Sequence, residues 1–471
     1  MSKFYTTTTL PYVNAKPHIG FALEIIQADV IARFHKALGD EVIFNTGTDE
    51  HGQKIYQKAT EEKKDPKQYC DEYAAKFEDL KKALNLSYTN FIRTTDSSHI
   101  KAAQKFWEIC NENGDIYKKN YKIKYCVGCE LEKTDSELID GKCPLHPNRE
   151  IEIREEENYF FKFSKYQNSL LDFYEKNPNF LIPENRFNEI KAFVENGLED
   201  FSISRLKEKM PWGIEVPNDK TQVMYVWFDA LINYISTLGW PENMSNFNDF
   251  WPGIQVAGKD NLRQQSAIWQ AMLMSAKLPN TKQIFIHGFL TVNGAKISKS
   301  LGNAINPIEI TEKYGTDALR YYLLAKINPT EDSDFSEEKF KETYNADLAN
   351  GLGNLVARIA KLCERVTFQE NKKNIKMDNQ IIKYLINYKF NEALDYLWNK
   401  IKILDQKINE VKPWKITDEI KLKEFLNENV NQILELTYNL QPFLPETAEK
   451  IIKQFTNSKI IAQNPLFPRI S

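Results

Sequence analysis

The 471-residue sequence predicts an α/β protein in which a parallel-sheet domain is interrupted by an insertion and followed by an all-helical domain. Three observations support this prediction. The chain opens with a strand-like run, a helical pattern and a second strand-like run. Short aromatic and charged strand patterns with turn residues fill the region between residues 116 and 212. From Pro307 the pattern is helical almost to the end.

The first three elements predict a right-handed parallel crossover. Phe4–Leu10 is rich in threonine and aromatic residues and is typical of a buried strand. Apolar residues recur at helical spacing over His18–Leu38, and Glu41–Thr48 is again strand-like. Ligands bind beyond the carboxyl ends of strands in such sheets. The segments His18–Gly20 and Thr48–Gly52 both fall at that edge.

The rest of the sheet is expected further along the chain. Tyr56 to about Asn113 has a helical pattern, and the insertion is predicted over 116–212. Strand patterns return at Val223–Phe228, Gly253–Ala257 and Gln283–Ile286, which would complete the sheet.

The helical region after Pro307 has breaks at 326–334 and 369–378. The expected units, in chain order, are the first half of the sheet domain over 1–115, the insertion over 116–212, the second half over 213–290, a linker region over 291–345 and a helical domain over 346–471.

Composition excludes several classes of protein. Hydrophobic content of 42% and charged content of 27% are ordinary for a globular chain. The longest apolar runs are too short to span a membrane, and Met1-Ser2-Lys3 leads directly into a strand without a signal peptide. Six cysteines in so long a chain argue against a disulfide scaffold, so a reducing cytoplasm is expected. The net charge of −3 does not indicate nucleic-acid binding but permits it through a local basic face.

A lysine loop stands at Lys296-Ile297-Ser298-Lys299-Ser300, between Gly294 and Gly302. Alone, this pattern is typical of a solvated basic turn. Together with the His18-Ile19-Gly20 turn it indicates an ATP site, because two lysines and a helix N-terminus all favour a polyphosphate. We therefore expect the turn and the loop to face one triphosphate.

Two cysteine and histidine pairs predict a metal site. Cys126 and Cys129 form a C-x-x-C pair, and Cys143 and His146 form a C-x-x-H pair further along the chain. Three thiolates and one imidazole suit a tetrahedral structural Zn²⁺ site. Incidental free thiols are the alternative.

Other segments near the ligand edge allow two interpretations. Asp49 is either a helix N-cap or a carboxylate that holds a substrate ammonium group. The aromatic run Val226–Tyr234 suits core packing or the wall of a small apolar pocket. In Gly258-Lys259-Asp260, which follows a predicted strand, Asp260 is placed to accept from a ribose hydroxyl.

These motifs together resemble the class I aminoacyl-tRNA synthetases, and most closely the methionyl branch. His18-Ile-Gly matches the HIGH motif of the family, and Lys296-Ile-Ser-Lys-Ser matches its KMSKS loop with Ile297 in place of methionine. Thr-Gly-Thr-Asp-Glu-His-Gly, Trp-Phe-Asp-Ala, Gly-Lys-Asp and the single knuckle also match. The resemblance runs from about Tyr5 to about Trp414. It implies a Rossmann-like catalytic domain, an inserted zinc-knuckle domain and a helical-bundle anticodon-binding domain.

The resemblance also implies roles for individual residues. The expected methionine pocket consists of Leu10, Tyr12, Asp49, Trp227, Ala230, Tyr234 and Gln265. The expected ATP-binding residues are His18, Gly20, Gly258, Asp260, His287, Lys296 and Lys299, of which His18, Lys296 and Lys299 would be catalytic. The expected anticodon contacts are Asn350, Asn354, Arg358 and Trp414.

Two positions depart from the family pattern. Phe21 occupies the last position of the HIGH motif, where histidine is frequent, and cannot donate a hydrogen bond to a phosphate. Gln264-Gln265 stand where the family commonly has an aromatic residue or proline and then histidine, beside the methionine side chain. Gln265 can still donate a weak hydrogen bond to sulfur.

The implied activity is ligation of L-methionine to tRNA(Met) through a methionyl-adenylate, with ATP and Mg²⁺. The alternatives are a class I enzyme for leucine, valine, isoleucine or cysteine, a small-molecule nucleotidylyltransferase and a non-catalytic tRNA-binding relative. The insertion looks too short for the editing domain of the leucine, isoleucine and valine enzymes. The helical tail argues against a nucleotidylyltransferase. A monomer is expected, because the chain stops soon after the helical domain.

Overall fold

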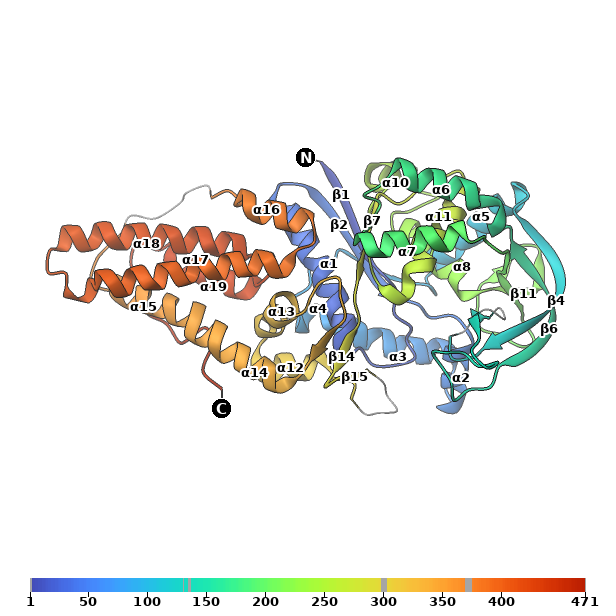
Figure 1. The fold of residues 1–471 in the computed structure, drawn as a ribbon, viewed down its shortest axis with the longest axis horizontal. Coiled ribbons are helices and arrows are strands. Elements are labelled where there is room, and N and C mark those ends of the chain that lie inside the picture. Colours follow the sequence, from blue (N-terminus) through green and yellow to red (C-terminus); the bar gives the residue numbers. More distant parts are fainter. Residues whose placement is uncertain (1, 130, 134–136, 298–302, 369–374, 471) are drawn as a thin grey trace.

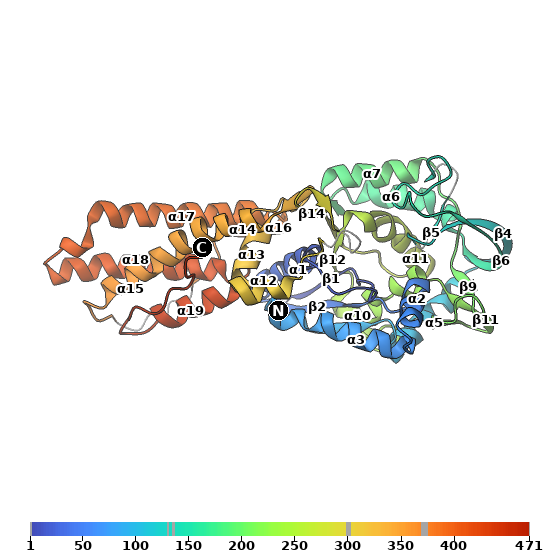
Figure 2. The same ribbon diagram turned by 90° about the horizontal axis from the view of Figure 1, so that it is seen from below.

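The structure is a computed structural model that describes residues 2–129, 131–133, 137–297, 303–368 and 375–470. It is elongated, with the helical bundle at one end and the hairpin of the insertion at the other (Figures 1 and 2). No helix among the described residues is long and apolar enough to cross a membrane.

A six-stranded, entirely parallel sheet of the order β3-β2-β1-β12-β13-β7 lies at the centre of the sheet domain. Its strands are β1 (Lys3–Thr8), β2 (Glu41–Thr48), β3 (Asn90–Arg93), β7 (Leu181–Ile182), β12 (Ile254–Gly258) and β13 (Gln283–His287). The strand order reverses between β1 and β12, because β2 and β3 are added on one side of β1 and the later strands on the other. In such folds, ligands bind at the carboxyl ends of the strands beside this reversal.

Helix α1 (Ile19–Ala37) follows β1 and packs against β1, β2 and β12. Its buried face is mainly apolar but includes Glu24, Gln27 and Asp29. The other helices of this domain are α2 (Gln53–Glu61), α3 (Pro66–Glu78), α4 (Leu80–Ala83), α5 (Ser97–Glu112), α8 (Val226–Ala230), α9 (Asn233–Ser236), α10 (Met244–Phe250) and α11 (Trp269–Ser275). The predicted parallel crossover at the start of the chain is confirmed.

Two sequence predictions in this domain are wrong. Val223–Phe228 is not a strand of the main sheet. Strand β11 (Asp219–Met224) pairs antiparallel with β9 (Ser204–Leu206) and β10 (Glu215–Val216), and α8 begins two residues after β11 ends. The helical pattern predicted from Tyr56 to Asn113 is interrupted by β3, a four-residue strand too short to show an alternating pattern.

The insertion carries a four-stranded antiparallel sheet of the order β5-β4-β6-β8. Its members are β4 (Ile116–Cys126), β5 (Leu131–Glu132), β6 (Glu152–Phe161) and β8 (Phe201–Ser202). Helices α6 (Gln167–Lys176) and α7 (Glu184–Glu195) flank β7, which pairs with β13. The predicted insertion therefore supplies an outer strand of the main sheet.

The linker region combines α12 (Pro307–Tyr314) and α13 (Thr316–Ala325) with a small sheet. This sheet contains β14 (Leu290–Val292), β15 (Ala295–Lys296) and β16 (Ser333–Phe335). Strand β16 falls largely in the break that the sequence predicts at 326–334, and it pairs parallel with β14, a strand that sequence analysis did not expect there.

The helical domain begins as one continuous helical run of three elements, α14 (Glu337–Thr343), a π-helix over Tyr344–Gly353 and α15 (Asn354–Cys363). The rest of the bundle consists of α16 (Asn379–Ile386), α17 (Phe390–Val411), α18 (Glu419–Leu440) and α19 (Pro445–Phe455). Leucines and isoleucines of α17, α18 and α19 are buried at helical spacing and form its core.

Candidate active site and metal centre

The turn between β1 and α1 presents His18 at a helix N-terminus. His18 is the N-cap of α1, and its Nδ1 accepts the amide of Gly20 at 3.1 Å. A neutral imidazole that accepts at Nδ1 carries its proton on Nε2. His18 therefore offers an N–H donor where the helix dipole already favours negative charge.

Described residues on either side of the gap at 298–302 lie against this turn. The amide of Ile19 donates to the carbonyl of Ile305 at 3.0 Å. A Cβ placed on Gly20 would lie 3.6 Å from Cδ1 of Ile297. The segments on both sides of the loop therefore lie beside the His18 turn. Lys296 is exposed on β15, whereas Lys299 lies outside the described residues.

Three predicted ATP-binding residues lie together at the ends of β12 and β13. Gly258 and His287 are direct partners across the two strands. A Cβ on Gly258 would lie 2.8 Å from Oδ1 of Asp260, which is too close, and 3.5 Å from Nε2 of His287, which is an ordinary contact, so a side chain there would displace the Asp260 carboxylate. The structure thus brings Gly258, Asp260 and His287 into one small group.

Glu24 of α1, which sequence analysis missed, joins this group to the amino-acid end of the site. Its carboxylate contacts Nε2 of His287 at 3.0 Å and accepts from the amide and hydroxyl of Thr9 at 2.8 and 2.6 Å. Burial alone would lower the pKa of His287, but the hydrogen bond and charge of Glu24 outweigh burial and raise it. A carboxylate on the buried face of an otherwise apolar helix was the signal available in the sequence.

Asp49 lies at the carboxyl end of β2, held by the backbone of the 11–13 segment. Its amide donates to the carbonyl of Pro11 at 3.0 Å, and its carbonyl accepts from the amide of Val13 at 3.3 Å. Asp49 is buried and is not an N-cap, because Gly52 precedes α2. Of its two sequence interpretations, capping is therefore wrong.

The predicted methionine residues combine buried polar groups with half-buried surfaces. Asp49, Tyr234 and Gln265 are buried, whereas the remaining four expected pocket residues are half-buried: Leu10, Tyr12, Trp227 and Ala230. Nε2 of Gln265 donates to the Tyr234 hydroxyl at 2.6 Å, from a π-helix over Gln264–Ile268. Burial raises the pKa of Tyr234, and the nearby charges of Glu24 and Asp49 raise it further. The ATP and amino-acid ends therefore meet near this hydroxyl.

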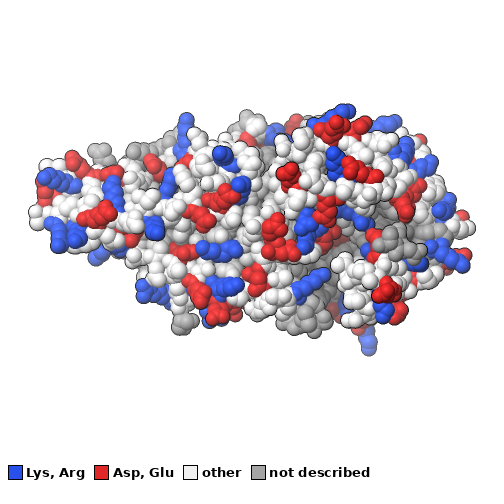
Figure 3. Space-filling model, in the orientation of Figure 1, with Lys and Arg blue, Asp and Glu red and all other residues white. Residues whose placement is uncertain are grey.

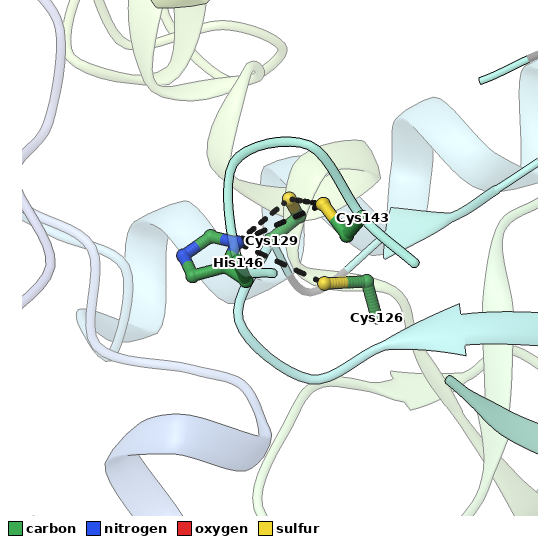
Figure 4. Close-up of side chains that lie close together, drawn as sticks. All are labelled: Cys126, Cys129, Cys143 and His146. Atoms are coloured by element: carbon green, nitrogen blue, oxygen red, sulfur yellow. Dashed lines mark hydrogen bonds between the residues drawn. The ribbon is translucent and has the colours of Figure 1, made fainter. Parts of the chain in front are cut away.

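The four predicted metal ligands converge in the insertion (Figure 4). Nδ1 of His146 lies 3.2 Å from the sulfur of Cys129 and 3.8 Å from those of Cys126 and Cys143, and Cys129 and Cys143 are 3.3 Å apart. A tetrahedral zinc site separates its ligand atoms by roughly 3.5–3.8 Å. The residues fit a structural zinc ion.

Two further features of the knuckle suit such a site. A Cβ on Gly128 would lie 2.3 Å from the His146 ring, so only glycine fits there. Burial lowers the pKa of His146, and neighbouring cations lower it further, which favours the neutral imidazole that a metal needs.

Comparison with known proteins assigns the family. A family model described as "tRNA synthetases class I (M)" matches residues 4–151 and 146–360. A methionine--tRNA ligase of Thermotoga maritima is 42% identical over 474 residues, which cover 96% of this chain and 75% of the relative. One of Thermosynechococcus vestitus is 48% identical over 370 residues, covering 77% of this chain and 70% of the relative. The chain belongs to the methionyl-tRNA synthetase family.

A solved structure of the family agrees with this assignment. Mycobacterium tuberculosis methionyl-tRNA synthetase in complex with methionyl-adenylate matches with a TM-score of 0.92 at 33% identity, and the match covers 100% of both chains. The expected combination of a Rossmann-like sheet, an inserted cysteine knuckle and a helical domain is thereby confirmed.

The structure explains one of the two departures from the pattern of the synthetase family. Phe21 packs edge to face against Phe77, with ring centroids 5.5 Å apart. Its side chain is therefore engaged in packing, and His18 is the donor of this turn. Gln265 hydrogen-bonds Tyr234, as described above, so the second departure is part of an ordered polar contact.

A buried polar cluster beneath the pocket was also missed. Asp229 contacts Nδ1 of His51 at 2.9 Å and Nε2 of His99 at 3.3 Å. All three side chains are buried. Asp229 lies on α8 between the expected pocket residues Trp227 and Ala230, and His51 lies two residues after Asp49. The cluster therefore joins the two segments that carry the expected methionine contacts.

The residues of the helical domain that are predicted to contact the anticodon lie on or beside α15. Asn350 and Asn354 are exposed, and Arg358 contacts Asp405 and donates to Oδ1 of Asn409 at 2.7 Å. Trp414 is 49% exposed, and nearby Arg365 of the 364–368 segment donates to the carbonyl of Ile416 at 3.0 Å. The end of α15 and the Trp414 segment are thereby joined. Positive and negative side chains are interspersed over the bundle face in Figure 3.

Proposed function

We propose that this chain ligates L-methionine to tRNA(Met) in two steps, with ATP as its Mg²⁺ complex. The observation that carries the proposal is the contact between the two halves of the nucleotide site, the 3.0 Å hydrogen bond from Ile19 to Ile305. It joins the His18 turn to the segment that follows the lysine loop. The family assignment supports the same activity.

In the first step, an oxygen of the methionine carboxylate attacks the α-phosphorus of ATP, and the bond to pyrophosphate breaks. Asp49 holds the methionine ammonium group, and Trp227, Ala230 and Tyr234 surround the side chain. His18, Lys296 and Lys299 donate to the phosphates as charge accumulates on them, which is the main requirement of phosphoryl chemistry. Gly20 and Gly258 allow ATP to approach the backbone closely, and Asp260 accepts a hydrogen bond from a hydroxyl of the ribose.

In the second step, a terminal ribose hydroxyl of tRNA attacks the carbonyl of the adenylate and AMP leaves. Neither step requires a nucleophilic side chain, so positioning provides much of the catalysis. The anticodon is proposed to contact four residues of the helical domain, Asn350, Asn354, Arg358 and Trp414, with Trp414 stacking on a base.

We infer that the chain acts as a monomer in a reducing cytoplasm, where its six cysteines remain outside disulfide bonds.

We propose that Zn²⁺ in the knuckle is structural. A bound zinc ion would tie Cys126 and Cys129 to Cys143 and His146 and so order the segment between β4 and β6. Elemental analysis of protein purified without chelator should find about one zinc per chain. Well under one equivalent would refute this assignment.

The deciding experiment is ATP–pyrophosphate exchange with each of the twenty amino acids. We expect exchange to depend on methionine, followed by charging of tRNA(Met). Exchange with leucine, valine, isoleucine or cysteine instead would reassign the substrate. Exchange without any amino acid would favour nucleotidyl transfer to another small molecule.

A further inference from the structure

The turn between α18 and α19 is held by two side chains of α13. Nε of Arg320 donates to the carbonyl of Phe443 at 2.8 Å, and its Nη2 donates to that of Pro442 at 3.0 Å. One turn earlier on α13, the Asp317 carboxylate accepts the Thr447 amide at 2.6 Å, in the first turn of α19. The helical domain is thereby fixed to the linker region by directional hydrogen bonds.

The same Arg320 is bound to α1. Its Nη2 lies 2.8 Å from Oδ2 of Asp29, and both side chains are fully buried. Asp29 in turn accepts from the amide and hydroxyl of Ser87 at 2.6 Å and from Nε of Arg33 at 2.7 Å. The Arg320 guanidinium therefore joins α1, α13 and the α18–α19 turn through one rigid group.

Helix α1 leads from this junction to the ATP end of the site. Asp29 is ten residues from Ile19, or about 15 Å along the helix axis at 1.5 Å per residue. Between them, Glu24 contacts His287, and His18 caps the N-terminus. The junction at Asp29 and the ATP end therefore lie on one helix, so the junction defines where the helical domain stands relative to the ATP end.

A second contact reaches the sheet itself. The Tyr388 ring, at the end of α16, stacks on Phe285 of β13 with centroids 4.5 Å apart and planes inclined by 12°. Its hydroxyl donates to Oε1 of Gln283 at 2.5 Å. Phe285 lies two residues before His287 on the same strand. The helical domain thus contacts both elements that carry the histidines of the ATP end.

We propose that Asp317 and Arg320 are positioning residues that set the helical domain against α1, so that an RNA bound to that domain meets the adenylate in register. This proposal rests on the proposed function. Stability alone does not explain a buried ion pair here, because well-packed apolar residues of similar volume often stabilise a protein equally well. Four hydrogen bonds and one ion pair, made to α1, to the carbonyl of Leu84 and to the 442–447 segment, instead define one relative placement.

The test separates the step that needs tRNA from the step that does not. Besides the carbonyls of Pro442 and Phe443, the Arg320 guanidinium also reaches that of Leu84, to which Nη1 donates at 3.1 Å. In Arg320→Lys the charge opposite Asp29 is kept, but a single ammonium group cannot span all three carbonyls. We expect kcat/KM for tRNA charging to fall at least about tenfold, because small misplacements are costly. Pyrophosphate exchange, normalised to active sites titrated by adenylate formation, should stay within about twofold.

Two further variants complete the design. Asp317→Ala removes the contact to α19 while Arg320 remains, so it should show the same split at smaller amplitude even if Arg320→Lys fails to fold. Leu426→Ala, a buried change within α18, should lower thermal stability without altering the ratio of charging to exchange.

The proposal would be overturned if the ratio of tRNA charging to pyrophosphate exchange were unchanged in both Arg320→Lys and Asp317→Ala. It would also be overturned if Leu426→Ala changed this ratio as much as they do. Loss of methionine-dependent exchange in the unsubstituted protein would instead refute the proposed function.

Discussion

The ATP end of the site is open and lined by exposed charges, whereas the methionine end is buried and internally hydrogen-bonded. Lys296 and Asp260 face solvent, and Gly20 and Gly258 leave room beside them. At the other end Tyr234 and its partner Gln265 are almost inaccessible to solvent. Glu24 links the two ends, since its carboxylate contacts His287 and accepts from the amide of Thr9, the residue before Leu10.

This difference indicates two modes of recognition. Phosphate carries its own charge and needs donors that converge on it when it arrives, so exposed lysines and a helix N-terminus are sufficient. A thioether side chain offers little beyond shape, so it must be selected by a preformed, desolvated surface. Substitutions at the ATP end should therefore affect the chemical step, and those at the methionine end should affect binding.

The largest effect is expected from the lysine loop. Lys299→Ala and Lys296→Ala should each lower the rate of methionine-dependent pyrophosphate exchange by about 10²–10³, as loss of one preorganised donor does. The KM for methionine should change little, because the loop does not belong to the buried end. Steady-state exchange kinetics measure both quantities.

Lys101→Ala is the control for this prediction. Lys101 is an exposed lysine of α5, and among the residues that the structure describes it forms an ion pair only with Glu242, at 3.8 Å. Its loss should leave exchange unchanged. A Lys299→Ala enzyme with exchange within a few-fold of the unsubstituted rate would disprove the role of the loop.

At the methionine end, the next largest effect is expected from Asp49→Asn. The amide keeps the size of the side chain but loses the charge opposite the substrate ammonium group. Charged hydrogen bonds contribute about 1.5–3 kcal/mol, so the Kd for methionine should rise roughly 10- to 100-fold. Equilibrium dialysis with methionine in the absence of ATP measures this directly.

ATP binding serves as the internal control for Asp49→Asn. If the Kd for ATP rose as much as that for methionine, the substitution would have disturbed the whole site, and the separation of the two ends would be wrong.

Linear motifs predicted most of the candidate site, because the residues that bind a common substrate recur at short spacings. Strand β2 was predicted with its observed bounds, Glu41–Thr48, since its pattern is local. The mistaken strand at Val223–Phe228 shows the limit. There the chain turns after Met224, where the Tyr225 amide donates to the carbonyl of Ile203, a tertiary contact that the local pattern does not contain.

Residues that act through distant partners were the ones missed. Glu24 is 263 positions from its partner His287, and Asp229 is 178 positions from His51. Glu24 and Asp229 each lie within an apolar run, which indicates a buried partner but does not identify it. Arg320 and Asp29 at the domain junction belong to the same category.

A smaller effect is expected from Gln265→Leu. Leucine is similar in size but leaves the Tyr234 hydroxyl without its donor. A neutral hydrogen bond contributes about 1 kcal/mol, so the Kd for methionine should rise about fivefold. Norleucine, which lacks the sulfur, should be discriminated less well if the polar pair recognises the thioether.

The double variant Gln265→Leu with Tyr234→Phe tests whether these two groups act as a pair. Because an apolar pair leaves no buried group unsatisfied, the double variant should lose less than the sum of the single variants. Additive losses would mean that Gln265 and Tyr234 act independently.

The smallest effect is a pH dependence confined to the ATP end. Glu24 raises the pKa of His287, so the protonated imidazole is more stable in the folded protein than in the unfolded chain. Its stabilising contribution is fully present below the unfolded pKa of about 6.5 and is lost as the pH rises through the higher folded value. In Glu24→Gln this dependence should flatten, and thermal unfolding of the two proteins should differ most at the acidic side of that window.

Histidine-ring NMR tests the same assignment residue by residue, since the sequence has only six histidines. The signal absent from a His287→Asn variant should titrate above the ordinary range in the unsubstituted protein and shift down in Glu24→Gln. Tyr234, whose pKa burial raises, stays protonated throughout, so its hydroxyl should add no pH dependence to methionine binding near neutrality. An unshifted His287 signal would mean that Glu24 serves Thr9 alone and that the ATP end does not depend on this charge pair.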